Sequence, residues 1–180
     1  LAAMAFHDAL QTTLTAQYTY GRWRPVAAIH EGDNDSNPNM VADPTWNSLL
    51  GDAGTPPHPS YPSNASSISA AIAKTLELYY GTDNVSFQID TGSTGVRSYP
   101  NFTSLANEVA KSRVFGGVHF PYEIVAGQKA GRDVAILLDS IPRLTSARSS
   151  ESMMPVRSED RSWSAKVGWF CMAMNIVGTP

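Results

Sequence analysis

The sequence predicts an all-α protein in which about four helices are joined by long polar connections. Apolar residues recur every three or four positions in several segments, which is the spacing of one helical face. Apolar residues make up 42% of the chain and charged residues 16%, so a packed core is feasible and wholesale disorder is disfavoured. Strand-like alternation is confined to residues 85–89, which are too isolated to predict a strand. The length of 180 residues suits one domain with a tail.

The first helix is expected over residues 1–20, with a break at Gly21. Its apolar face would hold residues at helical spacing, namely Ala3, Phe6, Leu10, Leu14 and Tyr18. Residues 31–62 are rich in Gly, Asp, Asn and Pro and form the longest irregular stretch. A loop of this length in a compact domain is usually functional or wraps the surface.

The clearest helical pattern covers residues 66–80, with an apolar face of Ile68, Ile72, Leu76 and Tyr79. Ser63, Asn64 or Ser66 can cap its first turn, and Gly81 suits a left-handed stop.

Two further helices are expected over residues 103–114 and 121–138. Thr103 or Ser104 would cap the first of them, and Pro121 fits the first position of the second. The inward face of the second would consist of Ile124, Gln128, Gly131, Ala135 and Leu138.

From residue 140 the composition changes, and we divide the chain into a helical core over 1–139 and a tail over 140–180. The tail is a Ser- and Arg-rich linker followed by an aromatic segment, in which Trp163, Trp169 and Phe170 would cap the bundle or dock a partner. The chain has a single cysteine, Cys171, which excludes an internal disulfide and a cysteine-based zinc cluster.

Charge and hydropathy exclude several function classes. The net charge of −3 argues against a nucleic-acid binder that relies on bulk charge, although a local anion site is compatible with it. No apolar run approaches the ~20 residues that span a bilayer, so we expect no membrane span. No targeting signal is visible, which leaves the localisation open.

Five residues in three chemically dense segments suggest an oxyanion site. Arg24 and Arg113 are cationic forks that suit a tetrahedral anion. Ser63 precedes a helix, so its hydroxyl and the first free N–H groups can donate to that anion. His119 can attack or ligate the central atom, and Glu123 can hold the other imidazole nitrogen and fix the tautomer.

Each of these residues also has a purely structural interpretation. An arginine near an aromatic residue is usually a surface or stacking residue, and Ser63 alone is best explained as a helix cap. A histidine between Val118 and Phe120 is more often packed and satisfied than nucleophilic. Glu123 would ordinarily be a solvated acid in a first turn.

The three segments, in this order, resemble the signature blocks of the vanadium-dependent haloperoxidases and type 2 phosphatidic acid phosphatases. Arg24-Pro25, Pro62-Ser63 and Ser112-Arg113 match, with His119 at the required spacing. The surrounding stretches YGRWRPVAAIHEGDNDSNP, ADPTW and TPPHPSYPS are similar to the bacterial-type haloperoxidase branch. The resemblance runs from about Ala2 to Leu138.

The resemblance implies a helical bundle of the haloperoxidase and acid phosphatase type, truncated relative to full-length haloperoxidases, with a pocket for vanadate or for phosphate as a competing anion. Arg24, Arg113, Ser63 and Asn64 would bind that cofactor. His119 would be the axial ligand of vanadate or the nucleophile of a phosphatase. Glu123 would stand where the family has Asp. The partners would be peroxide and halide, or a phosphomonoester.

Departures from the family pattern bear on catalysis. Gln17 stands where the family has Lys, which removes one positive charge from the cradle. Asn64-Ala65 replaces Gly-His, and the lost histidine is the family's acid–base group, worth ~10²–10⁴-fold in rate. His58 lies seven positions before Ala65 and is a candidate to compensate for it.

Three functions follow from these signals. The first is a vanadium haloperoxidase-like protein of reduced activity, and the second is an acid phosphatase that acts through a phosphohistidine. The third is a catalytically degenerate member with a structural or assembly role, for which a homo-oligomer is an option. Secretion or a periplasmic location is favoured, and Asn64, Asn84 and Asn101 begin glycosylation sequons.

Overall fold

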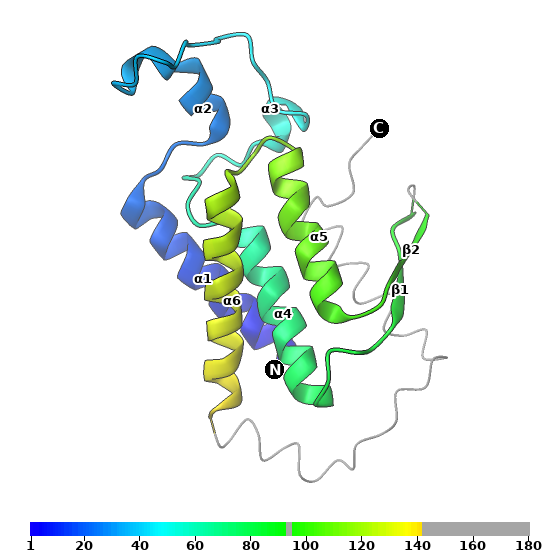
Figure 1. Cartoon of the computed structure of the whole chain (residues 1–180). Helices are drawn as coiled ribbons and strands as arrows, with labels where there is room; N and C mark the ends of the chain where they lie inside the picture. The colour runs from blue at the N-terminus through cyan, green and yellow to red at the C-terminus, as the bar shows by residue number, and fades with distance from the viewer. Residues whose placement is uncertain (93–94, 142–180) are drawn as a thin grey trace.

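The computed structural model describes residues 1–92 and 95–141 and shows a helical bundle. Four long helices form it, α1 (Ala2–Tyr20), α4 (Asn64–Tyr80), α5 (Phe102–Phe115) and α6 (Pro121–Asp139). Helix α4 lies in the middle and packs against the other three (Figure 1). The predicted helical bundle is therefore confirmed.

Helix α4 is buried around most of its circumference over its first half because its side chains there are small. Ser63 is its N-cap, and the Ser63 hydroxyl accepts a hydrogen bond from the Ser66 backbone N–H. Gly81 ends the helix in the left-handed conformation, with φ of 70°. The prediction of both ends is confirmed, although the helix begins two residues earlier than the pattern suggested.

Helices α4 and α6 approach each other closely through two glycines of α6. A Cβ atom added to Gly127 would lie 2.3 Å from the Ser63 carbonyl oxygen, and one added to Gly131 would lie 2.0 Å from that of Ser67. Both positions therefore require glycine. The predicted inward face is right for its second half and wrong at Ile124 and Gln128, because α6 buries Glu123 and Gly127 in its first half.

The predicted apolar face of α1 is right at Phe6 and Leu10, which pack against the core, and wrong at Ala3 and Tyr18. Its fully buried residues are Ala5, Ala9, Thr13 and Gln17, whereas Ala3 is exposed and Tyr18 is 69% exposed. Phe6 and Leu10 pack against the core cluster only with partial burial. The small side chains allow α1 to lie close to α4, and the larger ones pack along the edge of that contact.

A β-hairpin that the sequence did not predict separates α4 from α5. Strand β1 (Phe87–Asp90) pairs antiparallel with β2 (Val96–Tyr99), and Phe87 lies opposite Tyr99. Their rings stack 5.5 Å apart, and Phe87 also contacts Phe102. These contacts come from cross-strand pairing and from α5, so a pattern confined to residues 85–89 could not reveal them.

Helix α5 begins at a different cap from the one expected. Asn101 is the N-cap, and its Oδ1 accepts from Ser104 N at 2.7 Å and from Ser104 Oγ at 2.6 Å. Thr103 and Ser104 lie inside the first turn instead.

The long connection between α1 and α4 wraps the end of the bundle at which α5 passes into α6 (Figure 1). It contains the short helix α2 (Pro25–His30), the 3₁₀ turn η1 (Gly32–Asn34) and one turn of helix, α3 (Gly51–Gly54). Trp46, Ser48 and Leu50 pack against the Gly116-Gly117 turn that joins α5 to α6. The connection thereby covers the segment that leads to His119.

Within residues 1–92 and 95–141, none of the helices is both long and apolar enough to cross a membrane. The predicted tail lies almost entirely outside the described residues, including Trp163, Trp169, Phe170 and Cys171. The division of the chain at residue 140 therefore stays a prediction.

Candidate oxyanion site

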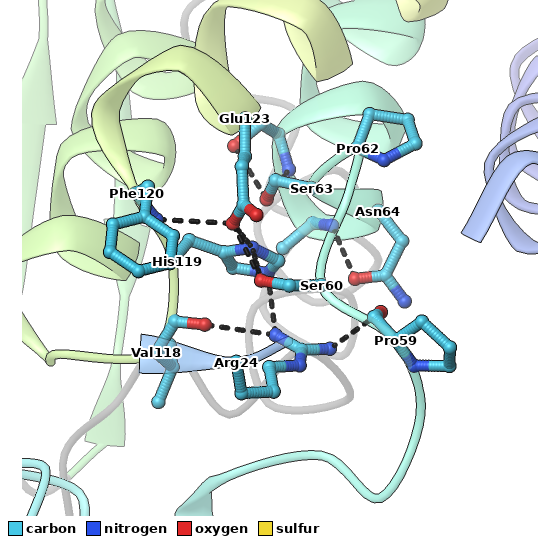
Figure 2. A network of polar contacts seen from close by, with 12 residues as sticks. Arg24, Pro59, Ser60, Pro62, Ser63, Asn64, Val118, His119, Phe120 and Glu123 are labelled. Atoms are coloured by element: carbon cyan, nitrogen blue, oxygen red, sulfur yellow. Dashed lines mark hydrogen bonds and ion pairs between the residues drawn. The ribbon is translucent and has the colours of Figure 1, made fainter. Parts of the chain in front are cut away.

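Four separate segments meet at one end of the bundle. They are Arg24 at the N-cap of α2, the stretch 58–63 that leads into α4, the last turn of α5 with Arg113, and the first turn of α6 with its preceding His119. Figure 2 shows the side chains of Arg24, Ser60, His119 and Glu123 pointing toward one another. Arg24, Ser63, Arg113 and His119 are each at most 6% exposed, and Glu123 is fully buried.

Arg24 uses all five of its N–H hydrogens on protein acceptors. Nε donates to the His58 carbonyl at 2.9 Å, and Nη1 donates to the Val118 carbonyl and to His119 Nε2, both at 3.0 Å. Nη2 lies 3.3 Å from His58 Nδ1 and 3.4 Å from the Pro59 carbonyl oxygen. Burial lowers the pKa of Arg24 to about 10, against the opposing effect of Glu123, so the guanidinium is charged at neutral pH.

The contacts of His119 fix its tautomer. Because Arg24 Nη1 can only donate, His119 Nε2 is the acceptor and the ring proton resides on Nδ1. Nδ1 then donates to Glu123 Oε2 at 2.8 Å, which is the contact that the spacing of these two residues predicted. Burial lowers the pKa of His119, and the charges of Arg24 and Arg113 lower it further, against the effect of Glu123. The imidazole is therefore neutral at neutral pH, with its Nε2 lone pair directed at Arg24.

Glu123 is the buried anion of the site. Its Oε2 accepts from Ser60 Oγ at 2.6 Å, from His119 Nδ1 at 2.8 Å and from Phe120 N at 3.1 Å. Burial alone would raise the pKa of Glu123, but the hydrogen bonds from His119, Ser60 and Phe120 lower it below its ordinary value. The interpretation of Glu123 as a solvated acid is therefore wrong.

Ser60, which no sequence motif predicted as a site residue, connects the loop before α4 to the first turn of α6. Its hydroxyl reaches Glu123 and lies 3.4 Å from His119 Nδ1, and its backbone N donates to the Arg22 carbonyl at 2.9 Å. The only signal was its place in the Pro-rich stretch before Ser63, since nothing local reveals a carboxylate on another helix.

Ser63 combines the two interpretations given to it. Its Oγ accepts from Ser66 Oγ at 2.9 Å and from Ser66 N, and its backbone N donates to the Glu123 carbonyl at 3.1 Å. In both hydroxyl contacts Ser63 Oγ is the acceptor, so its own hydrogen is still available to an anion. Asn64 instead accepts a hydrogen bond from Ala65 N, and no described contact joins it to Arg24 or His119.

Arg113 approaches the site from α5. Its carbonyl oxygen accepts from Val118 N at 3.1 Å and from His119 N at 3.3 Å, which ties the segment carrying His119 to the end of α5. Its Nε donates to Ser112 Oγ at 3.4 Å, and its charge lowers the pKa of both Arg24 and His119. The two guanidiniums therefore act on the same imidazole.

The positions that depart from the family pattern have different surroundings. Gln17 is fully buried and donates to the Pro62 carbonyl at 2.7 Å, while its Oε1 has no hydrogen-bond partner among the described residues. Ala65 is 8% exposed within α4 and offers no titratable group. His58 contacts Arg24, and burial together with that charge lowers its pKa.

A pocket of about 460 Å³ lies beside this cluster and is lined by Tyr20, Arg22, Tyr61 and Tyr122. Tyr61 has edge contact with Tyr20, with ring centroids 5.4 Å apart, and a tilted contact with Tyr122 at 5.8 Å. Burial and the charge of Glu123 raise the pKa of Tyr122. The pocket is thus a phenol-lined space close to the buried carboxylate.

The donor set fits a small oxyanion such as vanadate or phosphate. Arg24 and Arg113 bring two guanidinium charges into a buried cluster in which the imidazoles of His58 and His119 are neutral. Buried guanidiniums are groups that a bound anion can stabilise. Guanidinium forks and a hydroxyl hydrogen donate to the oxygens of such an anion, and the imidazole lone pair can bond to its central atom.

Comparisons with known proteins agree with the helical-bundle fold. The family model described as the VCPO second helical-bundle domain matches residues 1–143. None of the curated proteins matches the chain.

Two solved bacterial structures are similar to the chain. One is the first bacterial vanadium-dependent iodoperoxidase, with 33% identity and a TM-score of 0.63 over 75% of this chain and 30% of that chain. The other is an apo-type bacterial vanadium-dependent chloroperoxidase, with 23% identity and a TM-score of 0.57 over 72% of this chain and 33% of that chain. The chain therefore spans about a third of the length of each.

Proposed function

The chain belongs to the vanadium haloperoxidase superfamily, and from this membership we propose that it binds vanadate at the Arg24–His119 cluster and supports peroxide-dependent halide oxidation at a reduced rate. One observation carries the proposal. His119 has a neutral imidazole whose Nδ1 proton is held by Glu123 and whose Nε2 lone pair meets a guanidinium inside a buried cationic cluster.

Each residue has a distinct task in this proposal. Arg24 and Arg113 balance the negative oxygens, and Ser63 donates its hydroxyl hydrogen to one of them. Glu123 and Ser60 keep the proton of His119 on Nδ1, so that Nε2 is presented as the ligating atom. Bound vanadate would supply the electrophilic centre that activates peroxide. Ala65 provides no acid–base group, which accounts for a rate lower by ~10²–10⁴-fold.

The same geometry supports a phosphatase as the second candidate. A neutral imidazole with its tautomer fixed by a carboxylate is a competent nucleophile toward phosphorus. The phosphoryl group would transfer to His119 Nε2 as the ester oxygen departs, and water would then release phosphate. The leaving alkoxide would need a proton that Ala65 cannot give.

A structural role is the third candidate, and the bonding of Arg24 favours it. All five donors of this guanidinium are already taken by protein acceptors, so Arg24 also holds the connection before α4 against the α5–α6 turn. A degenerate member would retain Arg24 for that contact alone.

Vanadate titration of the full chain, followed by ⁵¹V NMR, separates these candidates. We expect saturable binding that phosphate competes away, and its loss in His119→Ala. His7→Ala, which changes an exposed histidine at the start of α1, is the matched control and should bind like the unchanged chain. Failure of both anions to bind would leave only the structural role.

Activity assays then distinguish the two enzymes. Iodide- or bromide-dependent halogenation of a dye supports the haloperoxidase, whereas vanadium-free hydrolysis of a phosphomonoester with a trapped phosphohistidine supports the phosphatase. Ala65→His should raise whichever activity is present by about 10²-fold, because it restores the missing acid–base group. An unchanged rate would show that another group already performs that task.

A further inference from the structure

His58 and His119 contact the two terminal nitrogens of one guanidinium. Arg24 Nη1 donates to His119 Nε2, and Arg24 Nη2 lies 3.3 Å from His58 Nδ1. The remaining three hydrogens of this side chain point to carbonyl oxygens. An anion that takes a hydrogen bond from Arg24 Nη2 must therefore displace one of the present acceptors, either His58 Nδ1 or the Pro59 carbonyl.

The Nδ1 atom of His58 has two neighbours that require opposite protonation states. Toward Arg24 Nη2 it can only accept, so the ring must be unprotonated at Nδ1. Toward the Pro59 carbonyl oxygen, also at 3.3 Å, it can only donate, so Nδ1 must carry a proton. Protonation of Nδ1 thus exchanges one hydrogen bond for the other and releases Arg24 Nη2.

We propose that His58 takes up a proton when an oxyanion binds to Arg24 and displaces the hydrogen bond between Arg24 Nη2 and His58 Nδ1. The proposal rests on the proposed anion site and adds its proton partner. In this step one N–H bond forms at His58 Nδ1, the bond that held the proton in hydronium or a buffer acid breaks, and the neutral imidazole becomes an imidazolium cation.

The charges around His58 favour this coupling. The charge of Arg24 acts directly on His58. The other titratable groups of the cluster, Arg113, Glu123 and His119, act on Arg24 or contact it in turn. Without an anion, Arg24 disfavours a second cation beside it. An anion on Arg24 offsets that repulsion, while the Pro59 carbonyl is already placed to accept the new N–H. His58 acts through Arg24 and is therefore a positioning and proton-exchanging residue.

Sulfate is the probe that tests this coupling, because it stays a dianion between about pH 5 and 8, where histidines titrate. Calorimetric titration of the full chain in two buffers of different ionisation enthalpy measures the protons taken up per sulfate. We expect uptake that rises toward about one proton, and an affinity that increases up to about tenfold for each pH unit lowered within the window. NMR should show the pKa of His58 rising when sulfate binds.

His58→Gln keeps an acceptor for Arg24 but cannot titrate, so we expect sulfate to bind without proton uptake. His30→Gln is the matched control, since His30 lies in the same connection and contacts the Trp46 carbonyl instead of Arg24. It should leave the uptake unchanged. Binding without uptake in the unchanged chain, or uptake that persists in His58→Gln, would overturn this proposal and leave the proposed anion site intact. Absence of sulfate, phosphate and vanadate binding alike would overturn both.

Discussion

The two ends of helix α4 are built from different chemistry. Its first half buries the hydroxyl residues Ser66, Ser67 and Ser69 next to Ser63 and faces the glycines of α6. Its second half packs Ala73, Leu76 and Tyr80 against the aromatic side chains of the hairpin and α5. One helix therefore joins a polar end, which holds the charged cluster, to an apolar end.

The difference indicates how each end contributes to stability. The apolar end removes large rings from water, and its stacked pairs add to the free energy of burial. The polar end also buries apolar side chains, such as Ile68 and Ala71 against α1, but it adds close backbone contact with α6 and hydrogen bonds between hydroxyl groups. Its buried polar atoms are also not all hydrogen-bonded, since Ser67 Oγ has no hydrogen-bond partner among the described residues. The candidate oxyanion site and the aromatic cluster thus lie at opposite ends of α4.

Gly131→Ala would break the fit of the polar end and should have the largest effect. The added Cβ would lie 2.0 Å from the Ser67 carbonyl oxygen. Because this is a backbone atom within α4, the clash can be relieved only if the two helices move apart. We expect a loss of at least about 3 kcal/mol in the free energy of unfolding. Alanine is the better helix former by about 1 kcal/mol, so any net loss must come from the clash. Urea unfolding measures it, with Arg132→Ala on the exposed side of α6 as control. Equal stability of Gly131→Ala would contradict the close contact.

Phe102→Ala tests the apolar end. Phe102 is 7% exposed and contacts Phe87 and Tyr80, so truncation leaves a cavity and should cost about 3 kcal/mol. The affinity of the folded protein for sulfate should not change, because the cluster is at the other end of α4. A weaker affinity of Phe102→Ala for sulfate, measured without denaturant and well below its unfolding temperature, would show that the two ends of α4 are coupled.

Glu123 is the carboxylate that contacts His119 among the described residues, and Glu123→Gln removes its charge at nearly the same side-chain size. Arg24 then loses the negative charge that stabilises it, and we expect a loss of about 2 kcal/mol in the free energy of unfolding. Phosphate should restore more stability to this variant than to the unchanged chain, because the anion replaces the lost charge. Thermal unfolding with and without phosphate measures the difference, and an equal gain in both proteins would speak against a shared cationic site.

The sequence predicted the elements with strong local signals. Residues 66–80 showed a clean helical period between a serine and a glycine, and both ends of that helix lie where capping chemistry puts them. For α1 the helix was predicted but its most buried residues were not, because packing selects Ala5 and Ala9 for their small size whereas the prediction followed apolar bulk. The hairpin was missed because the pairing of Phe87 with Tyr99 depends on a partner ten or more positions away.

The residues of the cluster also differ in how far the sequence predicted them. Arg24, Ser63, Arg113, His119 and Glu123 were selected because they recur in a known order of motifs, and the structure brings them to one end of the bundle, while their role at an anion stays a prediction. The contacts of Ser60 with Glu123 and of His58 with Arg24 depend on the conformation of a Pro-rich stretch, which the tertiary structure determines. Asn64, which precedes Ala65 in the motif, was expected at the anion and instead contacts its own helix.

The smallest expected effect is the dependence of stability on pH, which should differ between the polar end and the apolar end of α4. Burial lowers the pKa values of His119 and His58 below the ~6.5 of an unfolded histidine, so the folded state binds fewer protons than the unfolded state. Their contribution to stability is therefore complete above pH ~6.5 and is lost as the pH falls from there toward the folded pKa values, by at most about 1.4 kcal/mol per pH unit for each group. His58→Gln should reduce the slope of unfolding free energy against pH below ~6.5, whereas Phe102→Ala should lower the whole curve in parallel, because no histidine or carboxylate lies in its cluster. A slope that His58→Gln leaves untouched would mean that the polar end does not hold a neutral His58, and the proton exchange proposed for this residue would then have no free-energy basis.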